Sequence, residues 1–257
     1  MDSSRAIGFF DSGLGGLSVL ASAARRLPHE RFIYLGDSAN APYGTKSDSE
    51  VLALSNRAVG QLAARGIKAL VIACNTATGA AVESLRAQYH FPIIGLEPAL
   101  KLAADRYQEG LILVMATPLT LQSAKYQLLY EQYGQSAVSI PCPGLMDFVE
   151  REELSGTRLD SYLKELFAPY QGSRLAAVVL GCTHYLFIRE AIGKQLPPAT
   201  PLIDSNEGVT RHLVRRLEEN CLLAPEGQAG SIELFSTGDA EKTRQLQRMF
   251  RLAQQLP

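Results

Sequence analysis

Short apolar runs rich in β-branched residues alternate along the chain with longer stretches of helical periodicity. The runs are apolar throughout, which is typical of strands covered by helices on both faces. We expect strands at 6–10, 32–36, 69–74, 92–96, 111–115, 138–142, 176–182, 201–204 and 231–236. Between them the pattern predicts helices at 16–27, 47–65, 78–89, 98–107, 119–132, 158–168, 184–195, 206–219 and 240–254. This alternation indicates βαβ units, mostly parallel sheets and an α/β fold.

Two predicted strands end in similar segments. VIACNT at 71–76 corresponds to VLGCTH at 179–184, and both lead from an apolar strand through a cysteine into a helix start. The two segments are separated by about half the chain, as two similar α/β halves predict.

Length and composition restrict the class of protein. The 257 residues allow one large domain or two small ones, and 46% hydrophobic residues exclude disorder. The 25 basic and 26 acidic residues give a net charge of −1, without the basic excess of a dedicated nucleic-acid binder. No apolar run reaches the roughly 18 residues of a membrane span, and no signal-peptide core follows Met1. We therefore expect a cytoplasmic globular protein that binds neither nucleic acid nor membrane.

The four cysteines are too sparse for a disulfide scaffold and lack the pairing of a zinc site, so we expect no metal. Cys142 and Cys221 have no helix-start context, and we expect them to be structural. Cys74 and Cys182 each precede a predicted helix, whose N-terminus lowers a thiol pKa toward neutrality. The alternative is that both are simply small buried hydrophobes.

Polar residues follow several strands, at the strand ends where parallel sheets bind ligands. The loop DSGLGG at 11–16 fits a dinucleotide fingerprint at two glycines and fails at Ser18, and Asp11 would repel a pyrophosphate. Its glycines instead suit a turn whose backbone N–H groups receive a small carboxylate. A plain turn capped by Ser12 is the other interpretation.

Three further candidates have two interpretations each. Asp11 is either a loop cap or an acid that orients a neighbouring group, and His184 is either a helix cap or a proton partner of Cys182. The Pro42–Gly44 segment reads as a turn that places Tyr43 at the mouth of a site, or as an ordinary surface turn. Judged by its residues alone, Glu150 is a solvated helix residue.

Together these segments resemble the glutamate racemases of the aspartate/glutamate racemase family. The matching segments occur in family order: FDSGLGGL at 10–17, GDS at 36–38, PYG at 42–44, ACNTA at 73–77, AT at 116–117 and GCTHY at 181–185. Aspartate racemases usually have Cys-Thr-Glu in the second cysteine motif. His184 stands in that third place here, which favours glutamate.

The resemblance implies two doubly wound, flavodoxin-like domains related by a pseudo-two-fold axis, with the active site in the cleft between them. The first domain would comprise residues 1–97 and 208–257, and the second 98–207. It further implies a homodimer that supplies D-glutamate for peptidoglycan biosynthesis and uses no cofactor.

The resemblance also assigns roles. Racemisation removes the Cα proton from one face and returns a proton to the other, so two groups on opposite faces are needed. Cys74 and Cys182 would be this acid/base pair, assisted by Asp11 and His184 respectively, with Glu150 as an auxiliary acid. The substrate would be bound by Asp11, Ser12, Pro42, Tyr43, Gly44, Cys74, Asn75, Thr76, Thr117, Cys182, Thr183 and His184.

Other functions stay open at this point. A racemase or decarboxylase of the same group could act on aspartate, a nucleotide-dependent oxidoreductase could use the glycine loop, and a regulatory protein could bind a carboxylate without turnover. A cysteine hydrolase is disfavoured, because Cys182 and His184 are two residues apart on a helix start and Cys74 would be unexplained.

Overall fold

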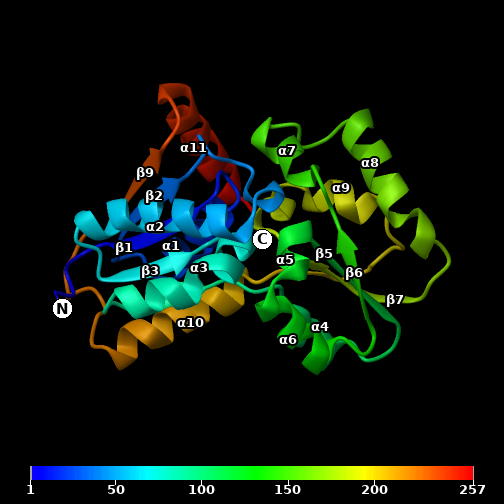
Figure 1. Cartoon of the computed structure of the whole chain (residues 1–257), viewed down its shortest axis with the longest axis horizontal. Coiled ribbons are helices and arrows are strands. Elements are labelled where there is room, and N and C mark those ends of the chain that lie inside the picture. The colour runs from blue at the N-terminus through cyan, green and yellow to red at the C-terminus, as the bar shows by residue number, and fades with distance from the viewer. Residues whose placement is uncertain (1, 257) are drawn as a thin grey trace.

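Nine strands form two separate sheets within residues 2–256, the part of the chain that this computed structural model describes (Figure 1). Every strand pair is parallel. The first sheet has the order β4-β3-β1-β2-β9, with bounds Ile93–Gly95, Ala69–Ile72, Ile7–Asp11, Arg31–Gly36 and Ser231–Ser236. The second has the order β6-β5-β7-β8, with bounds Ala137–Pro141, Leu111–Ala116, Leu175–Leu180 and Leu202–Ile203. The predicted α/β class with parallel sheets is confirmed.

The two sheets share one strand order. Read from its other edge, the second sheet is β8-β7-β5-β6, which repeats β4-β3-β1-β2 with every number raised by four. β3 and β7 are thus equivalent strands, and Cys74 and Cys182 follow them. The similarity of the two segments in the sequence therefore corresponds to an equivalence in topology.

Helices flank both sheets. They are α1 (Leu17–Arg26), α2 (Asp48–Ala64), α3 (Asn75–Gln88), α4 (Leu100–Arg106), α5 (Pro118–Gln122), α6 (Ala124–Tyr133), α7 (Leu145–Glu150), α8 (Thr157–Phe167), α9 (Arg189–Lys194), α10 (Asn206–Glu219) and α11 (Ala240–Ala253). Short 3₁₀ helices add η1 (Tyr43–Thr45), η2 (Ala168–Tyr170) and η3 (Thr183–Ile188). We call the first sheet with α1, α2, α3, α10 and α11 the five-stranded half, and the second sheet with α4 to α9 the four-stranded half.

All nine predicted strands are present, and the helices differ from prediction in four places. α3 begins three residues early, because Cys74 caps it. The helix predicted at 119–132 is broken at Ser123, whose extended backbone ends α5 and whose hydroxyl caps α6. The stretch predicted as one helix at 184–195 starts as η3 before α9, and α7 was not predicted.

The hydrophobic core joins the halves. α2 and α3 cover one face of the first sheet, while α1, α10 and α11 pack on the other. The core cluster under α1, α10 and α11 continues without interruption into α7, α8 and one face of the second sheet. α4, α5 and α6 cover the other face of the second sheet. In Figure 1 the blue, cyan and red elements therefore sit directly against the green and yellow ones.

Within residues 2–256, no helix combines the length and apolar character that crossing a membrane requires. The predicted first domain extends to residues 1 and 257, which lie outside the described residues.

Candidate active site

The carboxyl ends of β1, β3, β5 and β7 converge on one small enclosed cavity. Its lining residues are Ser12, Gly44, Cys74, Asn75, Thr76, Thr117, Thr120, Met146, Gly181, Cys182, Thr183 and His184. Nine of these twelve were predicted as site residues from the sequence. The cavity measures about 10 Å³, which is room for roughly one water molecule.

Cys74 is the residue that caps α3. Its Sγ accepts a hydrogen bond from Ala77 N at 3.4 Å and donates one to Ser12 Oγ at 3.7 Å. Burial, followed by the negative charge of Asp11, raises the pKa of the Cys74 thiol to about 12. The expectation that the helix N-terminus would bring this pKa toward neutrality is therefore wrong, because desolvation outweighs the single backbone N–H.

Cys182 has a different environment. Its Sγ lies 3.6 Å from His184 Nδ1, at the start of η3. The His184 ring is buried, and its other nitrogen, Nε2, lies 2.8 Å from Glu150 Oε1. Cys182 thus stands at the end of a chain of three side chains that includes a carboxylate.

The charges of this chain are coupled. Although burial lowers the pKa of His184, its contacts with Cys182 and Glu150 raise it well above the usual value. Burial raises the pKa of Glu150, but the hydrogen bond and charge of His184, the Leu14 N–H and the charge of Lys242 together outweigh it and hold this pKa below its usual value. Both shifts favour an imidazolium facing a carboxylate.

Glu150 is not the solvated helix residue that its local sequence indicated. Its side chain is only 12% exposed, and its Oε1 accepts a hydrogen bond from Leu14 N at 2.9 Å as well as contacting His184. Leu14 N of the glycine loop thus donates to the chain's own Glu150, and binding of a small carboxylate ligand by this loop stays a prediction. The long-range partner of Glu150 lies outside any local sequence pattern, which is why the residues alone could not place it.

Asp11 is fully buried at the end of β1. Its Oδ1 accepts a hydrogen bond from Gly13 N at 2.7 Å, and its Oδ2 accepts one from Thr183 Oγ1 at 3.3 Å, which joins the two halves. Burial raises the pKa of Asp11 to about 6, and the nearby His184 opposes this rise. It caps the loop as one interpretation predicted, and its charge also acts on Cys74.

Tyr43 is buried and lies behind the cavity. Its hydroxyl donates to Asp37 Oδ2 at 2.6 Å, so the expectation of a side chain at the site mouth is wrong; Gly44 is the residue of this turn that lines the cavity. Pro42 lies outside the lining as well. Asp37 also accepts hydrogen bonds from Asn40 and Thr237. Because both of its oxygens bond to protein groups, Asp37 is not free to bind the ribose of a dinucleotide, which argues against the oxidoreductase alternative.

Hydroxyl groups gather on one side of the cavity. Thr76 Oγ1 lies 3.0 Å from Thr117 Oγ1 and 3.1 Å from Thr120 Oγ1, and the last two are 2.9 Å apart. Beside them, Asn75 Oδ1 is buried and has no hydrogen-bond partner among the described residues. A buried acceptor without a partner is costly, and a ligand donor would satisfy it.

Sequence reasoning missed three lining residues. Thr120 follows Thr117 by three residues at a helix start, and this i, i+3 spacing was a usable signal. Met146 lies on α7, which was itself not predicted. Gly181 is the first residue of the GCTHY motif, but the sequence alone assigns it no role in the site.

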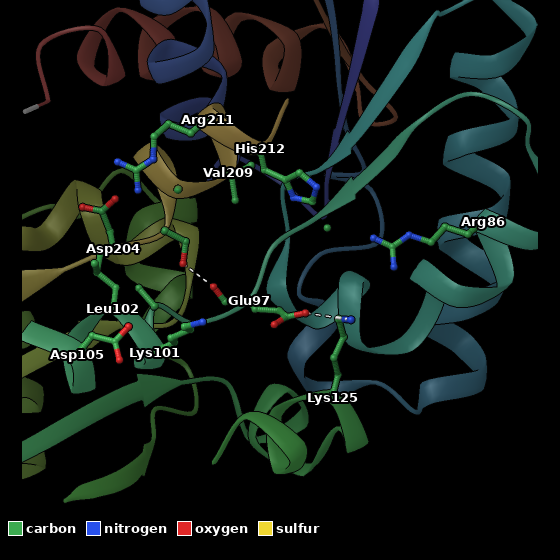
Figure 2. A pocket seen from close by; sticks show the side chains of 14 residues that line it. Arg86, Glu97, Lys101, Leu102, Asp105, Lys125, Asp204, Val209, Arg211 and His212 are labelled. Atoms are coloured by element: carbon green, nitrogen blue, oxygen red, sulfur yellow. Dashed lines mark hydrogen bonds and ion pairs between the residues drawn. The ribbon is translucent and has the colours of Figure 1, made fainter. Parts of the chain in front are cut away.

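A far larger cavity, of about 500 Å³, lies elsewhere and contains none of the predicted site residues. Figure 2 shows Glu97 inside it, bonded through its side chain to Lys125 and through its carbonyl to Ser205. Size therefore does not mark the candidate site, whereas the clustered thiols, hydroxyls and charges do. Within residues 2–256, no group of three or more His, Cys, Asp or Glu side chains could hold a metal ion.

Comparison with known proteins gives consistent results. The family model for Asp/Glu/hydantoin racemases matches residues 16–213. A glutamate racemase of Clostridium botulinum (strain Alaska E43 / Type E3) is 49% identical over 245 residues, covering 94% of this chain and 95% of the relative.

Two solved structures are similar over almost their whole length. The glutamate racemase of Francisella tularensis in complex with D-glutamate has a TM-score of 0.83 and 30% identity, and covers 98% of this chain and 94% of its own. The Escherichia coli glutamate racemase in complex with L-glutamate and the activator UDP-MurNAc-ala has a TM-score of 0.85 and 27% identity, with coverage of 97% and 95%.

Proposed function

We propose, because this chain belongs to the Asp/Glu/hydantoin racemase family, that it interconverts L- and D-glutamate without a cofactor. One observation carries the proposal. Cys74 and Cys182 follow the equivalent strands β3 and β7 of the two sheets, and both thiols line the same cavity. Glutamate is proposed as the substrate because the similar proteins are named glutamate racemases.

Two thiols meet the requirement of the reaction. One thiolate removes the Cα proton from one face of glutamate, and the other cysteine, as a thiol, delivers its proton to the opposite face. The carbanion electron pair is thereby protonated, the first cysteine ends as a thiol and the second as a thiolate. The reverse reaction exchanges the roles, so no redox partner is needed.

The two thiols have different surroundings. The raised pKa of Cys74 keeps it protonated at neutral pH, which makes it the acid of the resting site. Cys182, whose Sγ lies 3.6 Å from His184 Nδ1, is then the base. Asp11 assists at Cys74 by its charge, and Glu150 assists at Cys182 by keeping His184 protonated.

The polar lining holds the substrate. Asn75 Oδ1, the buried acceptor without a partner, receives the ammonium group. The hydroxyls of Thr76, Thr117 and Thr120 bind a carboxylate, since a carboxylate accepts from several hydroxyls at once. Ser12, Gly44 and Thr183 line the remainder, and Pro42 and Tyr43 support Gly44 from behind.

Binding requires the two halves to move apart. A cavity of about 10 Å³ is far smaller than glutamate, so the substrate reaches the thiols only through an opening between the halves. We assign residues 1–97 and 208–257 to one domain and 98–207 to the other, with the two chain crossings as the hinge. Cytoplasmic location, a homodimer and the supply of D-glutamate for peptidoglycan belong to the same proposal.

Chiral separation tests the function. Purified protein without added cofactor is incubated with L-glutamate and, separately, with L-aspartate. We expect D-glutamate to appear and D-aspartate not to appear. Formation of D-aspartate alone would mean that the protein is an aspartate-specific member of the family. No turnover of either amino acid by folded, reduced protein would favour a carboxylate-binding protein.

A further inference from the structure

The C-terminal helix α11 carries one buried polar side chain that reaches the four-stranded half. The other buried residues of this helix are apolar: Leu246, Met249, Phe250 and Ala253. Gln245, in contrast, is an amide that is only 6% exposed. A buried amide is costly unless it is fully hydrogen-bonded, so its position among these residues needs an explanation.

Both polar atoms of Gln245 are bonded, and the partners fix its orientation. Lys242 Nζ donates to Gln245 Oε1 at 3.0 Å, and Gln245 Nε2 donates to the Glu150 carbonyl at 2.8 Å. A lysine ammonium only donates and a carbonyl only accepts, so the amide cannot be flipped without losing both bonds.

The Glu150 carbonyl needs such a partner. Glu150 is the last residue of α7, and the final carbonyls of a helix have no partner within the helix. In Figure 1, α7 lies next to α11, and Gln245 therefore satisfies this carbonyl from the other half.

A second contact holds the same turn. Arg248, one helical turn after Gln245, contacts Glu152 with Nη2 at 2.7 Å and Nε at 3.3 Å. Glu152 has a φ of 58°, a left-handed conformation that is unfavourable for a residue other than glycine and that persists only when its surroundings hold it.

We propose that Gln245 is a positioning residue: it fixes the main chain at Glu150 and thereby aims the Glu150 carboxylate at His184, with Arg248 holding Glu152 two residues further along the chain. The chain of contacts runs from α11 through Glu150 and His184 to Cys182. This inference rests on the proposed racemase function, in which His184 acts beside Cys182.

The charged and titratable groups around His184 determine what a misplaced Glu150 does. Cys182 and Glu150 contact the ring, Asp11 faces it from the five-stranded half, and Lys242 acts on Glu150 from α11. Of these, Glu150 is the contact that α11 controls. Moving its carboxylate away lets His184 lose its proton at lower pH.

The test is Gln245→Met, which keeps the length of the side chain and removes both polar atoms. We expect kcat to fall by about ten-fold or more with KM within about three-fold, since a small misplacement of a reacting group has effects of this size. The alkaline limb of the kcat profile should move to lower pH. NMR titration of the His184 imidazole should show a lower pKa in the variant.

The control is Arg244→Met on the same helix, because Arg244 pairs with Glu241 at 2.7 Å within α11 and, within residues 2–256, makes no hydrogen bond or ion pair with α7. It should leave kcat, the pH profile and the imidazole titration unchanged. If Gln245→Met does not fold, the exposed Arg248→Met variant takes its place, with a smaller change in the same direction expected.

A lower melting temperature with unchanged pH limb and unchanged imidazole titration would overturn the proposal and leave Gln245 a merely structural residue. The NMR titration does not depend on turnover. If the wild-type protein fails to racemise glutamate while the imidazole pKa still falls in Gln245→Met, the proposed function is wrong and the positioning role stands.

Discussion

His184 Nε2 lies 2.8 Å from Glu150 Oε1, and the same oxygen accepts a hydrogen bond from Leu14 N in the other half. One carboxylate oxygen thus serves the glycine loop and the histidine beside Cys182 together. In the proposed opening of the two halves, Leu14 N would part from Glu150, which would link the position of the halves to the charge of His184.

Replacing either active-site thiol should abolish turnover. Cys74→Ser and Cys182→Ser should each lower racemisation in both directions by at least about a thousand-fold, since a serine hydroxyl is a far weaker acid than a thiol. Cys221→Ser is the control, because Cys221 is exposed and is not among the residues that line the cavity. Chiral separation measures the rates, and an unchanged melting temperature shows that the fold is intact. Full activity of either active-site variant would exclude the two-thiol mechanism.

Asp11→Asn should stabilise the fold at neutral pH. Burial raises the pKa of Asp11 from 3.8 to about 6, so the favourable state of this group is the protonated one. Its contribution to stability is fully present below pH 3.8 and is lost as the pH rises through about 6, a change of about 3 kcal/mol. The asparagine variant does not lose it.

Denaturant unfolding at several pH values checks this. The free energy of unfolding of Asp11→Asn minus that of wild type should grow between about pH 4 and pH 6 and stay constant above. Asparagine keeps an oxygen for Gly13 N, so the loop can persist. A difference that does not vary with pH would mean that Asp11 is not held at a raised pKa.

Gly13→Ala should disable the site. An added Cβ at this position would lie 2.8 Å from Glu150 Cδ and closer still to Oε1, which forces the carboxylate away from His184. We expect turnover to fall on the order of a hundred-fold. Gly208→Ala is the matched control in α10, where no atom lies within 4 Å of the added methyl group, and it should gain about 0.5–1 kcal/mol of stability with unchanged activity. Equal activity of the two variants would contradict the packing described at Glu150.

The sheets could be predicted from the sequence because the strands are continuous apolar runs. Side-chain N-caps also mark the starts of α2, α3, α5, α6 and α11. The break at Ser123 was missed, since helical periodicity continues across it and only the cap hydrogen bond to Tyr126 N marks it. α7 was missed because six residues are too short for a clear periodic pattern.

The residues of the candidate site likewise fall into those that local sequence could place and those that it could not. Cys74, Thr76, Thr117, Cys182 and Thr183 follow strand ends, where local sequence is enough to place them. Glu150 and Tyr43 were misjudged because their surroundings are set by distant partners, Leu14 and Asp37 respectively. Gln245 had no signal at all, since its function depends on a carbonyl that lies 95 residues away in sequence.

Racemisation of L-glutamate in deuterated water tests the two-thiol site most directly. The D-glutamate formed at early times should carry one deuterium at Cα, while the remaining L-glutamate stays unlabelled, because one cysteine removes the proton and the other delivers solvent deuterium. Chiral separation followed by mass spectrometry measures both pools. Protium retained in D-glutamate, or equal labelling of both pools from the start, would contradict two opposed thiols and indicate a single base.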